Sequence, residues 1–391
     1  MKDSIQFPFY AKLAFVLLSL ISIFTILYLG QNIIVPILMS LLFAILLRPI
    51  AHFLKSKWRF PHVLAVTCTV VLFVLMVTAI LFFISWQIGD IANDWGAIQT
   101  NLSIHFDTIQ KFISSNFNLN NVEQKVLIDN ASKNVLESGK NIIGTSLVSV
   151  SDVILNMTLI PIYIFLFLLY RTLFITFLSK LFQPEYHEKL QDILFHIKVS
   201  VQSYIVGLLI EMVIVSSLTT VGFMIIGVKY AVVLGLITGL LNLIPYIGIL
   251  FAGILSVIAT LTASPDLTLI IGVLIIVIVV QLIDNNLIVP MIVGSKVQIN
   301  AFVSIVGIIV GGVIAGFSGM FLAIPIIAIM KVIFDRIESL EPWGYIMSDD
   351  LPKSYTWDKE ANPNCEIIAE QTNINTIPPN PNLDTDEIDL N

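Results

Sequence analysis

The feature that most constrains the fold is a series of long apolar runs separated by short polar intervals. The runs occupy roughly residues 13–29, 33–47, 63–88, 153–170, 199–226, 230–262, 267–289 and 301–334. A helix of about 20 apolar residues crosses the ~30 Å hydrocarbon core of a bilayer, and several runs reach that length. We therefore predict an all-α polytopic membrane protein with about eight hydrophobic segments.

Composition supports this class and excludes several others. The chain is 57 % hydrophobic and 12 % charged, with a mean hydropathy of +0.93. The net charge of −7 reflects the C-terminal end, because residues 341–391 hold 11 of the 27 acids. We predict a disordered acidic tail over 341–391. No basic patch indicates nucleic acid, and Cys68 and Cys365 indicate neither a disulfide framework nor a metal site. No cofactor is predicted.

Loop charge predicts the sidedness of the chain. Residues 48–61 contain Arg48, Lys55, Lys57 and Arg59 but no acid, so this loop and the N-terminus should be cytoplasmic. Residues 1–88 then hold the first membrane helices, and 89–150 form an external domain of amphipathic helices. Residues 151–198 comprise a membrane helix and a cytoplasmic interfacial helix after Pro184, and 199–340 form a core with broken helices. The C-terminus is expected to be cytoplasmic.

Two apolar segments are too long for one simple span. Residues 230–262 and 301–334 contain 33 and 34 residues, about 50 Å as straight helices. The first is interrupted at Asn242, Pro245, Tyr246 and Gly248, and the second by a glycine-rich stretch at 311–319. Paired broken segments are typical of substrate sites in transporters. The alternative is two kinked helices that only pack closely.

These interruptions leave two topologies open. Each long segment is either a kinked span, giving eight spans, or a re-entrant hairpin, giving six full spans and an inverted repeat. Residues that would allow close packing or hinge motion there are Gly294, Gly311, Gly312, Gly316, Gly319 and Pro325. Small-xxx-small spacings occur at Gly235/Gly239, Gly307/Gly311 and Gly312/Gly316.

Polar residues within the apolar runs indicate a site. Glu211 lies in the middle of 199–226, on one helical face with Tyr204 and Gly207. Acids at this depth are costly and usually functional, although a structural hydrogen bond is the simpler alternative. A second group closes the run 267–289, where helical spacing puts Gln281, Asp284 and Asn285 on one face. The predicted path for a solute or ion is formed by these polar residues and by the first broken segment. It comprises Glu211, Asn242, Pro245, Tyr246, Gly248, Gln281, Asp284, Asn285, Asn286 and Pro290.

Four motifs together resemble one family. They are NLIPYIG at 242–248, QLIDNN at 281–286, VPMIVG at 289–294 and LAIP at 322–325. The chain resembles the autoinducer-2 exporter family of bacterial inner-membrane permeases from about residue 10 to 340. It departs from the family at Ile249 and Ala301, where the family usually has proline. The resemblance implies an oligomeric transporter that works by a large conformational change, but it does not fix the substrate.

Three classes of function remain to be compared. Transport is favoured. The first possibility is export of a small polar solute, such as a quorum-sensing compound, and the alternative is exchange of sodium or lithium for protons. An intramembrane enzyme is disfavoured because the stretch around Ser318 lacks a histidine base at membrane depth, so no catalytic residue is predicted. A non-transporting scaffold or receptor is the third class. The expected partners are the solute or ion, the lipid bilayer and further copies of this chain.

Overall fold

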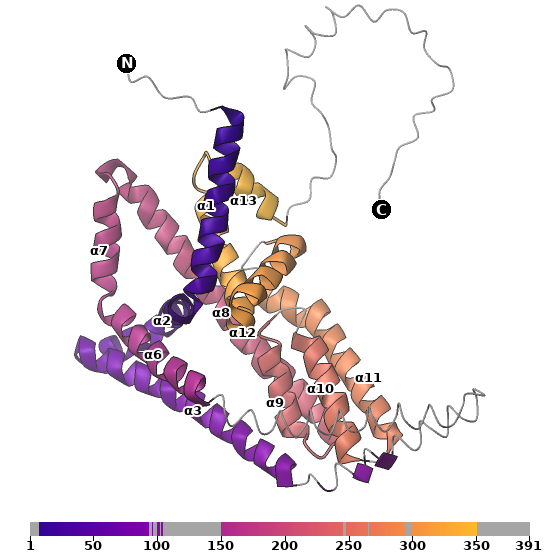
Figure 1. Ribbon diagram of the computed structural model, residues 1–391. Coiled ribbons are helices and arrows are strands. Elements are labelled where there is room, and N and C mark those ends of the chain that lie inside the picture. The colour runs from indigo at the N-terminus through magenta and orange to yellow at the C-terminus, as the bar shows by residue number, and fades with distance from the viewer. Residues whose placement is uncertain are drawn as a thin grey trace, which may run out of the picture. The chain divides into compact units, whose positions relative to one another are not determined.

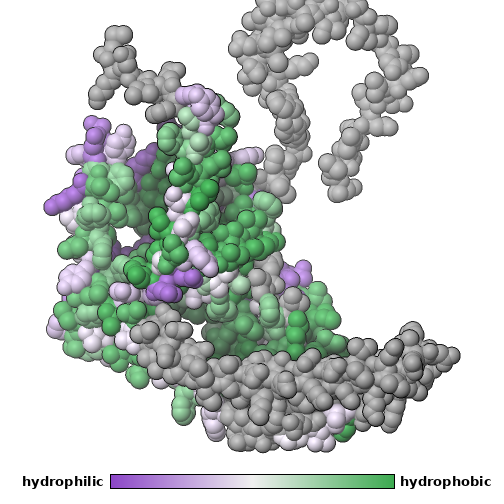
Figure 2. Space-filling model, in the orientation of Figure 1, coloured by the Kyte–Doolittle hydropathy of each residue, from purple (hydrophilic) through white to green (hydrophobic). Residues whose placement is uncertain are grey.

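The computed structural model describes residues 8–93, five positions between 96 and 104, and residues 150–244, 248–264, 266–294 and 299–349. Within these ranges the chain is helical almost throughout and has no strand, which confirms the predicted all-α polytopic fold. Most of the predicted external domain, and the tail from residue 350 onward, lie outside the described residues. On the face that Figure 2 shows, the described surface is mainly apolar, with small polar patches, one of them around the turn that precedes α8.

Three helices form the N-terminal part. α1 (Phe9–Leu29) is followed directly by α2 (Gln31–Lys57), and α3 comprises His62–Asn93. No described residue of α1 is fully buried within the chain, whereas α2 and α3 pack with α6 (Val150–Leu169) around a common cluster. That cluster includes Leu47, Phe73 and Ile164. α2 is therefore an internal wall of the bundle, and α1 faces its surroundings.

The chain bends sharply after α6. α7 (Arg171–Leu181) leaves the direction of α6 at an angle of 66° and is followed by a short 3-10 turn at Pro184–Tyr186. α8 then continues without a break over His187–Ile225. The helix predicted after Pro184 is therefore present, but it is continuous with the membrane helix that follows it, and its interfacial position stays a prediction. At 39 residues, α8 is about 58 Å long, nearly twice the hydrocarbon thickness.

The first broken segment is a helical hairpin. α9 (Ala231–Leu241) and α10 (Gly248–Ala263) are separated by residues 242–247, and α9 packs closely on α8. Val233 near the start of α9 belongs to the same apolar cluster as Ala263 at the end of α10, so the two helices run in opposite directions. α11 (Leu267–Ile283) packs beside α10 (Figure 1). It continues into π-helical turns at Asp284–Ile288 and Pro290–Gly294.

The second broken segment is also a hairpin. α12 (Ala301–Phe334) has non-helical backbone at Ala315 and Gly316, where Gly316 takes φ 57° and ψ −140°. Only glycine adopts this conformation readily, so the chain can turn back there. Gly311 lies against the backbone of Gly319, and Gly307 lies against Ile327. The two arms are thus antiparallel, and both ends of α12 lie on the same side of its tip.

The end of α12 is held by a further short helix. α13 (Glu341–Met347) returns to the start of α12, where the backbone nitrogen of Asn300 donates to the carbonyl of Met347 at 3.0 Å. The Asn300 side chain also donates to the carbonyls of Ile346 (2.7 Å) and Ser348 (3.1 Å). The predicted disordered tail therefore begins too early, because residues 341–347 are folded and docked.

The number of helices that can cross a membrane follows from their length and composition. Among the described residues, six helices are long and apolar enough to do so, and the bent α6–α7 pair would be a seventh. One of these candidates is α12, which folds back at Gly316. With α12 and the α9–α10 pair as re-entrant hairpins, six candidate crossings remain, so the helix geometry favours the hairpin topology of the two alternatives.

Candidate functional site

Three buried polar side chains meet where α8, the tip of the first hairpin and the end of α11 come together. The side-chain nitrogen of Asn242 donates to Glu211 Oε1 at 2.7 Å and to Asp284 Oδ2 at 3.2 Å. Glu211 and Asn242 are each 5 % exposed, and Asp284 is 2 % exposed. One amide group thus links two carboxylates that lie 73 residues apart in the sequence.

Local structure explains why each of these side chains points inward. Glu211 lies on the buried face of α8 that also carries Tyr204 and Gly207, as its helical spacing predicts. Asn242 is the C-cap of α9, where the helix ends and the chain turns. Asp284 is the C-cap of α11 and begins the π-helical turn, a local widening that is common at functional sites. Two of the three side chains are therefore at breaks in a helix.

The electrostatics of this cluster are unbalanced. Two carboxylates share the two N–H donors of one amide, and Asp284 Oδ1 is buried without a hydrogen-bond partner. No basic side chain pairs with either acid among the described residues. Burying two uncompensated negative charges costs far more than the two hydrogen bonds contribute. The arrangement therefore needs a proton on one carboxyl group, or a cation at the free oxygen of Asp284.

The remaining residues predicted near Asp284 do not join the cluster. Gln281 is half-buried, whereas Asn285, Asn286 and Pro290 are exposed. Asn286 donates only to the carbonyl of Leu282, one turn earlier on its own helix. The predicted shared face assumed α-helical spacing, and the π-helical turn from Asp284 changes the angle between successive side chains. The amide that contacts Asp284 comes instead from Asn242.

The tip of the first hairpin is only partly described. Pro245 and Tyr246 lie outside the described residues, so their predicted role in the path stays a prediction. Gly248 begins α10, and a side chain there would collide with the backbone of Leu241. The hairpin can therefore close only with glycine at this position.

The glycines of the predicted small-xxx-small pairs differ in how closely they approach a neighbouring helix. Gly235 and Gly239 let α9 approach α8, since a Cβ at either would strike Ser216 or Thr220. Gly311 and Gly319 bring the arms of α12 together in the same way. At the predicted packing pair Gly312/Gly316, Gly312 lies close to the flexible end of Met320, whereas a side chain at Gly316 would meet open space. Gly294 ends the second π-helical turn, and Pro325 is buried in the second arm of α12.

A second polar feature lies at the tip of α12. A cavity of about 190 Å³ is bounded by the turn between α1 and α2 and by the hairpin tip, and its polar lining is Gln31, Asn32 and Ser318. Its other walls are apolar and include Met39 of α2 and Ile160 of α6. In the sequence, Gln31 and Asn32 only separate two apolar runs, and the stretch around Ser318 stood out only as a rejected nucleophile motif. Neither signal could show that the two segments meet.

α8 also carries hydroxyl groups that sequence reasoning missed. Ser216 Oγ and Thr219 Oγ1 are buried without a hydrogen-bond partner, and both lie one to two turns after Glu211. Ser216 faces the backbone of α9 at Gly239. Single hydroxyl groups within an apolar run carry too weak a sequence signal to single out, since they also occur where helices merely pack.

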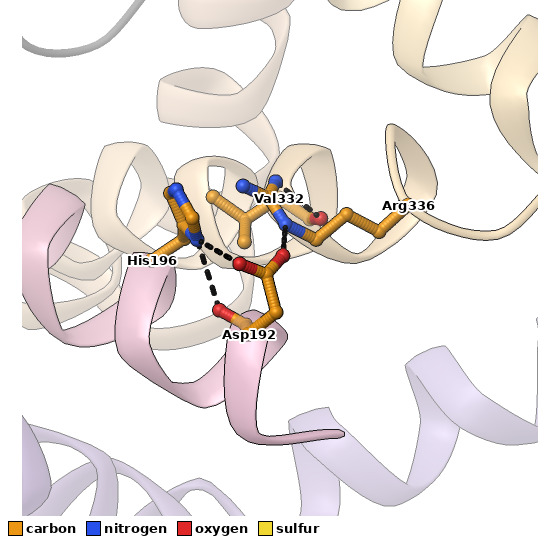
Figure 3. Close-up of polar contacts among 4 residues, drawn as sticks. All are labelled: Asp192, His196, Val332 and Arg336. Carbon is orange, nitrogen blue, oxygen red and sulfur yellow. Dashed lines mark hydrogen bonds and ion pairs between the residues drawn. The ribbon is translucent and has the colours of Figure 1, made fainter. Parts of the chain in front are cut away.

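An ion pair joins α8 to the end of the second hairpin, away from the buried cluster. Arg336, just after α12, donates from Nε to Asp192 Oδ2 of α8 at 2.6 Å, and its second nitrogen donates to the carbonyl of Val332 (Figure 3). His196, one turn along α8, contacts the same carboxylate at 3.1 Å. Asp192 is exposed and Arg336 is half-buried, and their pair links the start of α8 to the end of the second hairpin.

Comparison with known proteins gives a consistent result. A family model described as "AI-2E family transporter" matches residues 17–339. The chain is 26 % identical over 318 residues to a Bacillus subtilis protein named "Putative transport protein YueF", covering 78 % of this chain and 84 % of that protein. It is 24 % identical to the Escherichia coli K12 protein named "Putative permease PerM", covering 81 % and 91 % of the two chains. A shorter match, 33 % identical over 133 residues, covers 34 % of this chain and 37 % of the B. subtilis "Putative transport protein YrrI".

Proposed function

The chain belongs to the AI-2E family of transporters, and from that premise we propose that it exports a small polar solute across the bacterial inner membrane by alternating access. The observation that carries the proposal is the buried cluster of Glu211, Asn242 and Asp284. It lies where a full-length helix meets the tip of a re-entrant hairpin. Broken backbone at membrane depth persists where protein or a water-filled cavity surrounds it, and transporters place their substrate sites there.

The packing around α8 supports an alternating mechanism. The first hairpin contacts α8 through Met212, Ser216 and Thr220, which follow Glu211. The second hairpin packs on Val201, Tyr204 and Leu208, which precede Glu211 on α8. The same apolar cluster also contains Ile244 at the tip of the first hairpin. The two hairpins thus meet opposite halves of one helix, with Glu211 between them. Moving one hairpin away from α8 would open the cluster to one side of the membrane only.

The polar groups suit an uncharged or cationic solute better than an anion. The cluster carries two carboxyl groups, and the cavity at the α12 tip is lined by two amides and a hydroxyl group without a charged side chain. Either set of groups can hydrogen-bond a small polar molecule such as the furanone signal after which the family is named. A role in quorum sensing would follow from that substrate.

Exchange of sodium or lithium for protons is the second candidate. It is favoured by one specific observation, the free buried oxygen Oδ1 of Asp284 beside a second carboxyl group. A carboxylate pair of this kind can bind a monovalent cation in one conformation and a proton in the other. In this version Glu211 and Asp284 are themselves the transport site, whereas in solute export they couple transport to the proton gradient.

Transport assays in proteoliposomes test these proposals. Wild-type protein is compared with Glu211→Gln and Asp284→Asn under imposed pH and sodium gradients, using a panel of small polar metabolites and radiolabelled sodium. We expect Glu211→Gln to lose gradient-driven accumulation at least tenfold while downhill exchange persists, and Asp284→Asn to weaken binding of the solute or cation. Glu188→Gln, an exposed acid on the same helix, is the matched control and should behave as wild type.

The outcomes separate transport from the alternative of a scaffold or receptor. Wild-type flux that ignores both gradients and every solute would contradict the transport proposal. Loss of thermal stability in the two variants, with no change in the flux of the folded fraction, would assign both acids a purely structural role. The proposal also includes assembly into homo-oligomers, which the largely exposed apolar surface of α1 would allow, and chemical cross-linking in native membranes tests it.

A further inference from the structure

Three basic side chains from three helices converge at the predicted cytoplasmic end of the bundle. They are Arg48 of α2, Arg171 at the first position of α7, and Lys198 of α8. Packing brings them together, because Leu47 beside Arg48 shares a buried cluster with Leu168 near Arg171. The segment of α2 before Arg48 packs in a second cluster with Ile197 and Val201, which flank Lys198.

The three charges act on one another rather than on acids. Arg48 and Arg171 repel each other, and Lys198 is repelled by both. Arg48 and Lys198 are also half-buried, so solvent screens them incompletely. Among the described residues, no carboxylate pairs with any of the three; Asp192 and Asp335 pair with Arg336 and Lys331 instead. Such a site holds positive charge that nothing within the described chain neutralises.

We propose that Arg48, Arg171 and Lys198 bind a phosphate group, supplied by the headgroup of an anionic phospholipid. Arginine matches phosphate oxygens with two parallel N–H donors, and lysine adds a point charge. The site lies at the ends of apolar spans, the depth at which basic pockets between helices take lipid headgroups. Next to it α7 carries the exposed side chains of Leu173, Phe174 and Phe177, which offer an apolar surface to acyl chains.

This proposal does not depend on what the protein transports. Inorganic phosphate presents the same oxygens to the three bases, so the chemistry of the headgroup and of the free ion is shared. Position distinguishes them: a half-buried site beside an exposed apolar helix favours a ligand that carries its own hydrocarbon. The bound lipid would tie α2, α7 and α8 together at the start of α8.

Thermal unfolding of the delipidated full-length protein in detergent tests the site. Phosphatidylglycerol, phosphatidylcholine and inorganic phosphate are added separately to wild type, to Arg48→Gln/Lys198→Gln and to Lys55→Gln/Lys57→Gln. The last variant loses the same two charges from exposed positions at the end of α2. We expect phosphatidylglycerol to raise the unfolding temperature of wild type and of the Lys55/Lys57 variant by several degrees. The Arg48/Lys198 variant should lose that shift, and phosphatidylcholine should raise none of the three.

Each result supports or overturns the proposal. If inorganic phosphate raises the unfolding temperature by the same amount, and the Arg48/Lys198 variant loses that effect, the phosphate site is supported but its ligand is the free ion and not the lipid. Identical responses of all three proteins to phosphatidylglycerol would overturn the site. If the double variant fails to fold, lipid retention by Lys198→Gln and Lys198→Arg is compared by native mass spectrometry. Retention of phosphatidylglycerol by Lys198→Arg but not by Lys198→Gln supports the proposal. Equal retention of the lipid by both variants overturns it.

Discussion

Asn242 is the residue on which the geometry of the buried cluster depends. Its single nitrogen contacts both carboxyl groups, and each carboxyl group comes from a different helix. Removing this donor leaves Glu211 and Asp284 facing each other with no N–H group between them. The hairpin tip would also lose its polar attachment to α8 and α11.

We expect Asn242→Ala to destabilise the protein by about 2–3 kcal/mol, because it leaves buried acceptors unpaired. Thermal unfolding in detergent measures the loss, and transport by the surviving fraction should fall with it. Asn286→Ala removes the same group from an exposed position where it bonds only its own helix. That control should stay within about 0.5 kcal/mol of wild type. Equal stability of the two variants would show that the hydrogen bonds from Asn242 to Glu211 and Asp284 contribute nothing to the stability of the fold.

Sequence alone could nominate Glu211, Asn242 and Asp284, but it could not show that they meet. Each stands out by itself, as an acid in mid-span, an amide at a helix break or an acid before a polar turn. Their contacts join residues 31 and 42 positions apart, a separation that no helical period relates. The amides at 285 and 286 are close to Asp284 in sequence, but the π-helical turn directs them elsewhere.

At the scale of single elements, the arms of the second hairpin depend on glycine at particular positions. A Cβ at Gly311 would meet the backbone carbonyl of Gly319, which cannot move without opening the hairpin. A Cβ at Gly312 would meet Met320 Cε at 2.8 Å, and that methyl group can rotate away.

We therefore predict that Gly311→Ala impairs folding or transport, while Gly312→Ala is tolerated. The expected loss for Gly311→Ala is about 1–3 kcal/mol, typical of overpacking. Quantifying the folded fraction by size-exclusion chromatography, with transport of that fraction, compares the two. If both variants behave alike, the arms are not held by backbone contact and α12 opens more easily than the structure indicates.

The Asp192–Arg336 pair marks where the start of α8 meets the end of the second hairpin. If the hairpin moves relative to α8 during transport, fixing this contact should stop the cycle. In a background without Cys68 and Cys365, a short reducible bis-methanethiosulfonate reagent should cross-link Asp192→Cys/Arg336→Cys and stop most of its transport, which reduction of the cross-link restores. Lys331→Cys/Asp335→Cys places both cysteines at the end of α12 and should retain transport after the same treatment. Full activity of the cross-linked Asp192/Arg336 variant would mean that these ends stay together throughout the cycle.

The elements were predictable to different degrees. Apolar runs located the spans, and glycine or proline located the breaks, because both signals are local. The choice between kinked span and hairpin was not local, since it depends on contacts such as Gly311 with Gly319. The bend at Tyr170 has no signal in the sequence, because no proline or glycine marks it.

At the scale of the whole molecule, the hairpin topology makes a prediction about sidedness. With Cys68 and Cys365 replaced, a cysteine at Ser264 follows the second arm of the first hairpin. In the hairpin arrangement it lies outside, so a membrane-impermeant maleimide added to intact cells should label it. A cysteine at Asp349 should be labelled only after the membrane is opened. Labelling of Ser264→Cys only from inside would favour the eight-span arrangement.

The boundary of the folded unit gives a second prediction at this scale. The described fold ends at Asp349, after α13 has paired with Asn300. Truncation after Pro352 should leave insertion and transport intact. Truncation after Leu340 removes α13 and should lower the unfolding temperature by several degrees, because Asn300 loses its partners. A loss of transport on truncation after Pro352, with the protein still inserted, would assign a regulatory or partner-binding role to the acidic tail.

The two hairpins also constrain how the chain enters the membrane as it leaves the ribosome. α9 has 11 residues and α10 has 16, about 16 Å and 24 Å of helix, so neither can be held by the bilayer as a span of its own. Their exposed helix ends at the tip need partners that lipid cannot supply. The glycine face of α9 finds those partners on α8, which is synthesised earlier, and Asn242 finds one on α11, which is synthesised later. We therefore expect the first hairpin to settle after α8 and α11 are in the membrane, between two spans that supply its partners.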